Sequence, residues 1–241
     1  MQEAKCNITN IGTILTKAWQ GSQLMAIDAS GASVGLAIAW NNQAVFLTDF
    51  HVNHNLIQAT FHIIGTNIHG HLTNVYFPQD GANKLALLCT IERINSTRTH
   101  PLWIARGDFN MITKLEEKSG GRTRLEVESA YFKDFIQNNW LIDLPFNNKI
   151  YTWNNKRSSL QQNTSRLDRF LISDNAIHIG GDITALILWL SGLDHWPIFL
   201  QRQRPGNQAR RPFRFEEFWF THSDFSHMVT SIWKSFKPRE G

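Results

Sequence analysis

The sequence predicts a mixed α/β sandwich, and two observations support this fold class. Short runs rich in β-branched and aromatic residues, separated by Gly, Asn and His clusters, outnumber the segments with helical spacing. The helical segments interrupt these runs at irregular intervals, which favours a sandwich over a regularly alternating, doubly wound sheet. A chain of 241 residues is long enough for one such domain with a sizeable core, or for two small ones.

The first half of the chain is predicted to contain an opening helix, four strands and a second helix. Ile8, Ile11 and Leu15 recur at helical spacing and indicate the opening helix. A Gly-, Ser- and Ala-rich stretch at residues 29–35 separates this helix from the strands. The predicted strands span residues 36–40, 45–50, 56–64 and 71–77. Residues 84–94 place leucines and isoleucines at helical spacing, which predicts the second helix.

The second half begins with a short apolar strand at residues 102–105. Thr123 and Glu126 have the spacing of a capping box, which predicts the start of a helix. This helix is expected to carry Phe132, Phe135, Ile136 and Trp140. Further strands are expected at residues 150–153, 167–172, 183–190 and 196–200. A segment rich in Pro, Gly and Arg at residues 202–212 is typical of a linker.

Composition narrows the class of protein. The formal net charge is +4, and residues 202–241 hold eight basic and four acidic side chains, so the first 201 residues are neutral. A basic excess favours a polyanionic partner. Cys6 and Cys89 are too few for a disulfide framework and indicate reduced thiols in an intracellular protein. The longest apolar run, residues 183–190, is too short to span a bilayer, so no membrane association is expected.

The sharpest local feature is Gly107-Asp108-Phe109-Asn110, directly after a strand of apolar composition. A carboxylate and an amide two residues apart at a strand end can converge on one point of a cleft. There the carboxylate can orient or deprotonate a water, and the amide can donate to a phosphate oxygen. Taken alone, the pattern is also typical of a plain turn.

Asp168 and the pair Asp194-His195 form a second candidate set. An imidazolium held by carboxylates can stabilise the transition state of phosphoryl transfer. In isolation these residues equally suit a structural histidine at the start of a strand, and Glu3 carries no signal of its own.

Together and in this order, these segments resemble the endonuclease/exonuclease/phosphatase superfamily, whose fold is DNase I-like. The closest resemblance is to the endonuclease part of plant LINE-type retrotransposon polyproteins, and it covers nearly the whole chain. The matching segments are QEAKC (2–6), LTNVYFP (72–78), WIARGDFN (103–110), YTWNN (151–155), SRLDRFLIS (165–173), LDHWPI (193–198) and RPFRFEEFW (211–219). The resemblance implies an α/β fold, a four-layer sandwich of two mixed β-sheets flanked by helices.

The resemblance also implies a catalytic role for each matching residue. Asp108 would activate or orient the attacking water, Asn110 would bind a phosphate oxygen, and Tyr76 would contact the scissile phosphate. Asp168 would orient His195, which would act at the phosphate.

Three more positions match the site of this family. Thr152 matches an active-site threonine. Glu3 matches the carboxylate that holds the divalent cation, and Asp194 matches a residue near the metal. The implied cofactor is Mg²⁺ (or Mn²⁺), a hard cation that prefers carboxylate oxygens and stabilises charge on the phosphate and the leaving oxygen.

The sequence departs from this family at several positions. The family begins with one more strand, which carries an Asn at the metal site, and this first strand is expected to be missing here. Leu193 stands where a Ser usually precedes the Asp-His pair, Ala4 replaces a Thr beside Glu3, and Val34 replaces a Gly. These departures favour, as an alternative, a decaying copy of a mobile element.

Two further motifs suggest other chemistries. Residues 31–35 fit G-x-S-x-G, the nucleophile elbow of hydrolases, but this motif needs a helix after it, where a strand is predicted. His69 with His71, and His51 with His54, have spacings found in zinc sites, but no Cys pair or carboxylate completes a closed site. Solvated histidines of loops or strands are expected instead.

Three functions follow from the sequence. The first is a Mg²⁺-dependent endonuclease that nicks DNA, located in the nucleus by its family role. The second is a catalytically inactive remnant with weak nucleic-acid binding, and the third is a small-molecule phosphatase. The catalytic domain is expected at residues 1–201. Residues 202–241 are expected to form a basic linker and an aromatic helix leading towards an absent reverse transcriptase, which favours the first function over the third.

Overall fold

The computed structural model describes residues 8–28, 35–121, 124–157, 161–179, 182–188 and 193–202, together with residues 227, 230 and 231. The chain divides into two units, residues 1–205 and 206–241. Only the last three of these described residues belong to the second unit, so the aromatic helix expected there and nearly all of the linker lie outside the described part.

The described part contains both helices and strands in irregular order. Its helices are α1 (Ile8–Ala18), α2 (Gly81–Asn95), α3 (Glu128–Asn138) and the 3-10 helices η1 (Leu115–Glu117) and η3 (Asp174–Ile179). Its strands are β1 (Ser22–Ile27), β2 (Leu36–Asn41), β3 (Val45–Asn53), β4 (Leu56–Ile63), β5 (His69–Tyr76), β6 (Trp103–Asp108), β7 (Lys118–Ser119), β8 (Leu141–Asp143), β9 (Trp153–Asn154), β10 (Thr164–Ser165), β11 (Asp168–Ser173), β12 (Ile183–Ile187) and β13 (Ile198–Arg202).

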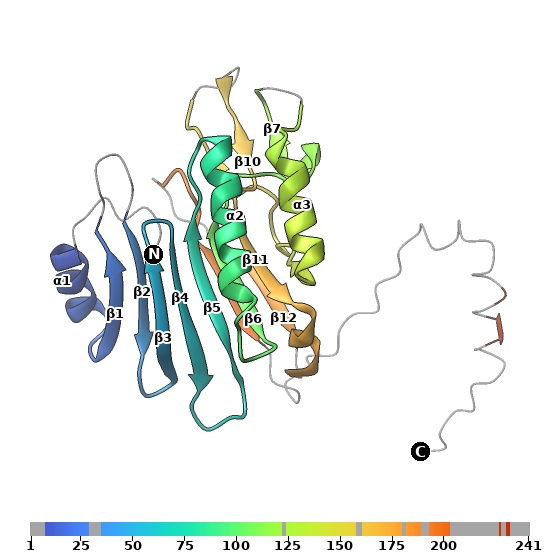
Figure 1. Ribbon diagram of the computed structural model, residues 1–241. Helices are drawn as coiled ribbons and strands as arrows, with labels where there is room; N and C mark the ends of the chain where they lie inside the picture. Colours follow the sequence, from blue (N-terminus) through green and yellow to red (C-terminus); the bar gives the residue numbers. More distant parts are fainter. Residues whose placement is uncertain are drawn as a thin grey trace, which may run out of the picture. The chain divides into compact units, whose positions relative to one another are not determined.

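A six-stranded sheet forms the centre of the first unit (Figure 1). Its strand order is β3-β4-β5-β6-β11-β8, and neighbouring strands run antiparallel except for the parallel pair β5 and β6. Helix α2 makes the crossover that a parallel pair requires. Asp80 caps this helix, because its carboxylate accepts a hydrogen bond from the backbone amide of Asn83 at 3.0 Å. The C-terminal ends of β5 and β6 therefore lie at the same edge of the sheet.

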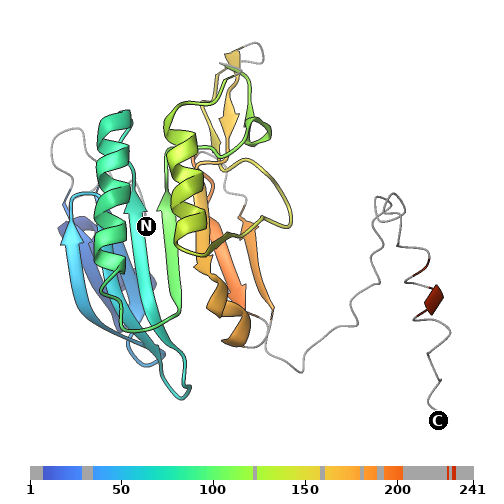
Figure 2. The same cartoon turned by 45° about the vertical axis from the view of Figure 1, so that its right-hand side comes forward.

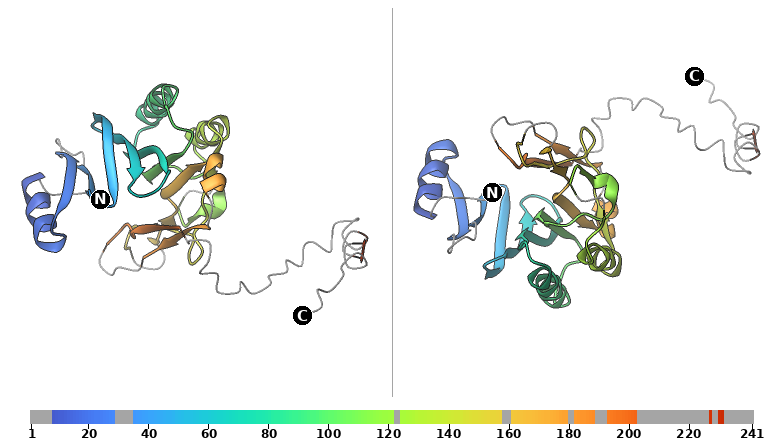
Figure 3. Two further views of the ribbon diagram at one scale, coloured as in Figure 1. Left: turned by 90° about the horizontal axis from the view of Figure 1, so that it is seen from below. Right: turned by 90° about the horizontal axis from the view of Figure 1, so that it is seen from above.

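Helices α2 and α3 cover one face of this sheet, and two β-hairpins face the other (Figures 2 and 3). The hairpins are β1–β2 and β12–β13, both antiparallel, and α1 packs against β1. Within the described residues the hairpins are separate two-stranded sheets, so the second sheet consists of two pieces. The predicted class, an α/β sandwich with helices outside the sheets, is confirmed.

Side chains of the main sheet alternate between two hydrophobic cores. On β6, Trp103 points to the helices and packs with Phe132, and both are fully buried. Ile104 points the other way and packs with Phe170 towards the hairpins. Asp108 lies four residues after Ile104 on the same strand, so it shares the face that looks towards the hairpins.

Most of the predicted strands are present, including the short ones predicted at residues 36–40 and 102–105, which form β2 and β6. β1 was missed, because five of its six residues are only half-buried and show no clear alternation. Of the strand expected at residues 150–153, only Trp153 belongs to a strand, β9. The long apolar run at 183–190 forms β12 as far as Ile187. Throughout the described segments, no helix has both the length and the apolar character needed to cross a membrane.

The capping box predicted at the start of α3 is wrong for Glu126, the described one of its two residues. The helix begins at Glu128, and its N-cap residue Val127 makes no side-chain capping bond. Glu126 instead forms an ion pair with Lys84 at 3.4 Å, because the start of α3 lies beside α2. Thr123 lies outside the described residues. Trp140 follows the helix rather than belonging to it; it has a φ of 53° and its side chain is exposed.

Candidate active site

Two candidate residues lie side by side at the ends of β5 and β6. Tyr76 and Asp108 are partners in the parallel register, and each is the last residue of its strand. Gly107 has a φ of 141° and Asn110 a φ of 49°, both in the left-handed region. Glycine and asparagine tolerate this region better than other residues, so the sequence suits the backbone on both sides of Asp108: Gly107 is still paired in β6, and Asn110 follows the strand. Asp108 between them is buried at 1% exposure.

Asn110 is fixed by its own loop. Its backbone amide donates to Asp108 Oδ1 at 2.8 Å, and its side-chain Nδ2 donates to the carbonyl of Phe77 at 2.7 Å. Gln79 Nε2 in turn donates to Asn110 Oδ1 at 3.1 Å. One Nδ2 hydrogen is used by Phe77, which leaves the second for a phosphate oxygen. Sequence reasoning missed Gln79, although it stands two residues after the motif NVYF.

Asp168 and His195 come together from distant parts of the chain. Asp168 is the first residue of β11 and the register partner of Asp108. His195 Nδ1 lies 2.9 Å from Asp168 Oδ2, and its Nε2 lies 3.9 Å from Asp108 Oδ2. Because an ionised carboxylate only accepts hydrogen bonds, Nδ1 carries the proton of the short contact. Nε2 is then directed towards Asp108, across a gap wider than a direct hydrogen bond.

Thr152 holds the backbone that presents both residues. Its hydroxyl oxygen accepts hydrogen bonds from the amides of Leu167 and Asp168 at 3.0 and 2.9 Å, and Thr152 is fully buried. Its carbonyl accepts from the amide of Trp196 at 2.8 Å, and the next residue, Trp153, forms a β-bridge with His195. The threonine predicted from the sequence thus acts on the positions of Asp168 and His195 through the main chain.

A charged residue that the sequence analysis overlooked lies behind this group. Arg106 is two residues before Asp108 on the same face of β6. Burial lowers the pKa of its guanidinium, and the charge of Asp168 opposes that shift. Its Nε atom has no hydrogen-bond partner within the described structure. The available signal was an arginine, Arg106, in the otherwise apolar run that precedes Gly107 and Asp108 in WIARGD, since a buried charge needs a partner.

The predicted metal ligands are only partly within the described structure. Glu3 lies outside it. Asp194 is half-buried next to His195, and its carbonyl accepts a hydrogen bond from the amide of Asn154 at 2.9 Å. In the described segments no group of three His, Cys, Asp or Glu side chains is arranged to hold a metal. The carboxylates at this edge of the sheet are nevertheless hard oxygen donors, the type that Mg²⁺ prefers.

A cleft of about 520 Å³ begins beside Asn110 and runs past Gln79 towards the start of α3. Two cations, Lys118 and Arg124, and two carboxylates, Glu126 and Glu128, line it, so its charged lining is formally neutral. The predicted phosphate-binding amide of Asn110 therefore shares this cleft with two cations and an equal number of carboxylates.

The competing motifs gain no support. Residues 31–34 of the G-x-S-x-G motif lie outside the described residues. His69 stacks on His62 with ring centroids 4.2 Å apart, and its other neighbour is the ring of His100. His71 Nε2 accepts a hydrogen bond from the amide of Thr99 at 3.2 Å, so this nitrogen is engaged by the main chain. The arrangement is that of packed strand histidines and does not form a zinc site.

Neither protein-family models nor the sequences of characterised proteins match this chain. Its similarity is to solved structures. The endonuclease domain of TRAS1, a telomere-specific non-LTR retrotransposon, has a TM-score of 0.57 and 17% identity over 78% of this chain and 81% of that one. D. rerio TDP2, complexed with a single-strand DNA product, has a TM-score of 0.55 and 14% identity over 83% and 82% of the two chains. An endonuclease/exonuclease/phosphatase family protein from Bacteroides thetaiotaomicron has a TM-score of 0.58 and 14% identity over 82% and 79%. The sandwich described above is thus the DNase I-like fold of the endonuclease/exonuclease/phosphatase proteins.

Proposed function

We propose that this chain hydrolyses phosphodiester bonds and nicks DNA. The observation that carries the proposal is the placement of His195, with Nδ1 2.9 Å from Asp168 and Nε2 facing Asp108. A histidine oriented by one carboxylate and facing another at a strand edge is suited to general acid-base and electrostatic catalysis.

The proposed roles follow from the geometry of each group. Asp108 orients the attacking water and accepts its proton, because its carboxylate is buried and close to the open edge of the sheet. His195, held by Asp168, is placed to stabilise negative charge on a phosphate oxygen. Asn110 donates its remaining Nδ2 hydrogen to the phosphate, and Tyr76 contacts it from the neighbouring strand.

The proposed cofactor is Mg²⁺, with Mn²⁺ as a substitute. Glu3 and Asp194 are the residues that would hold it, with oxygen ligands that suit a hard cation. When bound, the cation supplies a positive charge that stabilises the leaving oxygen.

DNA is the proposed substrate for two reasons. The similar TRAS1 domain is an endonuclease, and the similar TDP2 was solved with single-strand DNA. The cleft beside Asn110 also includes two cations, Lys118 and Arg124, that could each contact a phosphate, although Glu126 and Glu128 in the same lining balance their charge. Action on chromosomal DNA would place the protein in the nucleus.

The test is a nicking assay on supercoiled plasmid with Mg²⁺. We expect the parent protein to convert supercoiled to open-circular DNA, and both Asp108→Asn and His195→Ala to abolish the conversion. Asp134→Asn and His51→Ala, which change exposed residues of the same types, serve as matched controls and should keep it. A well-folded parent without nicking would identify an inactive remnant, and turnover of inositol phosphates without nicking would identify a phosphatase.

A further inference from the structure

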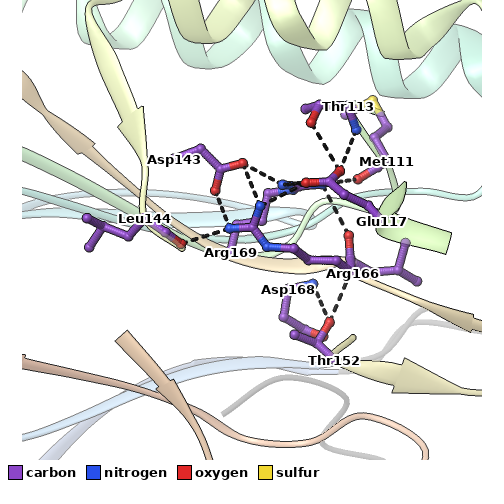
Figure 4. A network of polar contacts seen from close by, with 10 residues as sticks. Met111, Thr113, Glu117, Asp143, Leu144, Thr152, Arg166, Asp168 and Arg169 are labelled. Atoms are coloured by element: carbon purple, nitrogen blue, oxygen red, sulfur yellow. Dashed lines mark hydrogen bonds and ion pairs between the residues drawn. The ribbon is translucent and has the colours of Figure 1, made fainter. Parts of the chain in front are cut away.

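A cluster of four buried or half-buried charges lies behind the candidate site (Figure 4). Two arginines and two carboxylates make it up, so its formal charge is zero. Its members are Glu117, Asp143, Arg166 and Arg169. Arg166 pairs with Glu117 at 2.8 Å and with Asp143 at 2.6 Å, and Arg169 contacts the same two carboxylates. Arg169 is fully buried and Glu117 is 2% exposed.

The Glu117 carboxylate accepts hydrogen bonds from the loop that carries Asn110. Its Oε2 accepts the backbone amide of Thr113 at 2.7 Å and the Thr113 hydroxyl at 3.1 Å. Arg169 adds a contact to the same loop, because its Nη2 donates to the carbonyl of Met111 at 3.2 Å. The residues that follow Asn110 are therefore tied to the cluster at two places.

The cluster is also hydrogen-bonded to the segment that carries Asp168. Arg166 and Arg169 flank this segment, and the amide of Arg166 donates to the carbonyl of Glu117 at 2.8 Å. Asp168 and Arg169 are neighbours on β11, so their side chains point to opposite faces of the sheet. Arg169 thus anchors the strand from the helix side, while Asp168 meets His195 on the other side.

We infer that Glu117 is a positioning residue that holds the Asn110 loop and the Asp168 segment in one fixed relation. The inference rests on the proposed function for its catalytic consequence. A buried ion cluster is not needed for stability alone, since apolar residues of similar volume often stabilise a fold equally well. Hydrogen bonds to charged groups are short and directional, and Glu117 uses them to join two segments that each carry a site residue.

The nicking test uses two variants of the whole chain. Glu117→Leu/Arg169→Met replaces one acid and one base by apolar side chains and leaves the Arg166–Asp143 pair intact. Thr113→Val removes only the hydroxyl bond to Glu117, and Thr90→Val, which removes a hydroxyl bond on α2, is its matched control. We expect the double variant to remain folded at the assay temperature but to lose at least about ten-fold in kcat with little change in KM. Thr113→Val should lose about two- to five-fold in kcat, and Thr90→Val nothing.

A second readout does not depend on activity. This readout is the hydrogen-exchange rate of three backbone amides. The amide of Phe109 donates to the carbonyl of Leu167. The amides of Leu167 and Asp168 donate to the hydroxyl oxygen of Thr152. In the double variant, and in Thr113→Val to a smaller degree, these amides should exchange faster while those of β4 stay protected. Parental exchange and parental kcat in both variants would overturn the inference. If the parent itself does not nick, the proposed function fails and hydrogen exchange alone decides the positioning role; if the double variant does not fold, Thr113→Val decides it.

Discussion

Asp168 Oδ2 lies 2.9 Å from His195 Nδ1, although 27 residues separate the two in the chain. Asp168 is also the register partner of Asp108 across β6 and β11. The imidazole is therefore held by one carboxylate and directed at another, and both carboxylates come from adjacent strands of a rigid sheet. The orientation of the His195 ring is therefore fixed by residues on paired strands of the main sheet.

Asp168→Asn tests the orientation of His195. An amide can turn its NH₂ group towards Nδ1, which selects the other tautomer and removes the charge that stabilises an imidazolium. We expect nicking to fall by about 10²–10⁴, with the fold retained by circular dichroism. Asp174→Asn, an exposed aspartate at the far end of β11, is the control and should keep parental activity. Equal rates for the two variants would show that Asp168 has no part in the reaction.

Thr152→Val tests the main-chain role of the buried threonine. Valine has nearly the same shape but leaves the amides of Leu167 and Asp168 without their acceptor. Each buried, unpaired amide costs about 1–3 kcal/mol, so the free energy of unfolding should fall by about 2–6 kcal/mol in urea denaturation. Thr152→Ser keeps the hydroxyl and should recover most of this loss. Thr48→Val, at a half-buried position, should have little effect.

The acid stability of the fold depends on Glu117. Burial alone would raise the pKa of its carboxyl, but the hydrogen bonds and charges of Arg169, with bonds from Thr113 and Arg166, lower the pKa from 4.5 to about 2. Because the folded-state pKa is depressed, this stabilisation is complete above pH 4.5 and is lost as the pH falls towards 2. It amounts to about 3 kcal/mol.

The measurement is the free energy of unfolding at several pH values between 2 and 5. Glu117→Gln should lower stability at neutral pH and remove the part of the slope that belongs to this carboxyl. The variant and the parent should therefore converge near pH 2. A parental slope in the variant would contradict the assignment.

Lys118 and Arg124 provide a prediction about salt. Each cation that contacts a phosphate of duplex DNA contributes about 0.9 to the slope of log affinity against log salt. Lys118→Gln/Arg124→Gln should therefore reduce that slope by about 2, measured by fluorescence anisotropy with Ca²⁺ in place of Mg²⁺. Arg93→Gln/Lys133→Gln removes two exposed cations of α2 and α3 and should leave the slope unchanged. An equal reduction in both double variants would mean that the cleft has no special role.

The sequence could predict those parts of the site whose residues lie close together in the chain. Gly107 and Asn110 adopt positive φ angles on either side of Asp108, and both residue types can be recognised within four consecutive residues of the sequence. The pairing of Asp168 with His195 is not local: the residues alone suggested it only beside an equally suitable structural interpretation, and the resemblance to a known family favoured it. Glu117 could not be found at all, because an acid in the segment LEEK looks like a solvated charge. Its burial depends on two arginines that are 49 and 52 residues away.

The same reasoning explains why strands were found more easily than helix ends. β4 is long, mostly buried and rich in apolar and β-branched residues, so its composition identifies it without tertiary information. The start of α3 depends instead on its position beside α2, where Glu126 meets Lys84. A capping box is a local signal, and here the tertiary ion pair decided the role of the glutamate.

Phe109 links the hydrophobic core to the candidate site, and its substitution separates stability from activity. Its ring is fully buried between Phe77 and Phe132, with centroids 5.3 and 5.2 Å away, while its chain neighbours are Asp108 and Asn110. Phe109→Leu leaves a cavity that should cost about 1–3 kcal/mol, and the backbone will relax into it, carrying the carboxylate and the amide with it. Phe135→Leu in the same core should cost a similar amount but lies away from the site residues. Nicking assayed well below both melting temperatures should therefore fall at least ~10-fold for Phe109→Leu and stay parental for Phe135→Leu. Parallel losses in the two variants would show that activity follows global stability, and that the aromatic ring between Asp108 and Asn110 has no positional role.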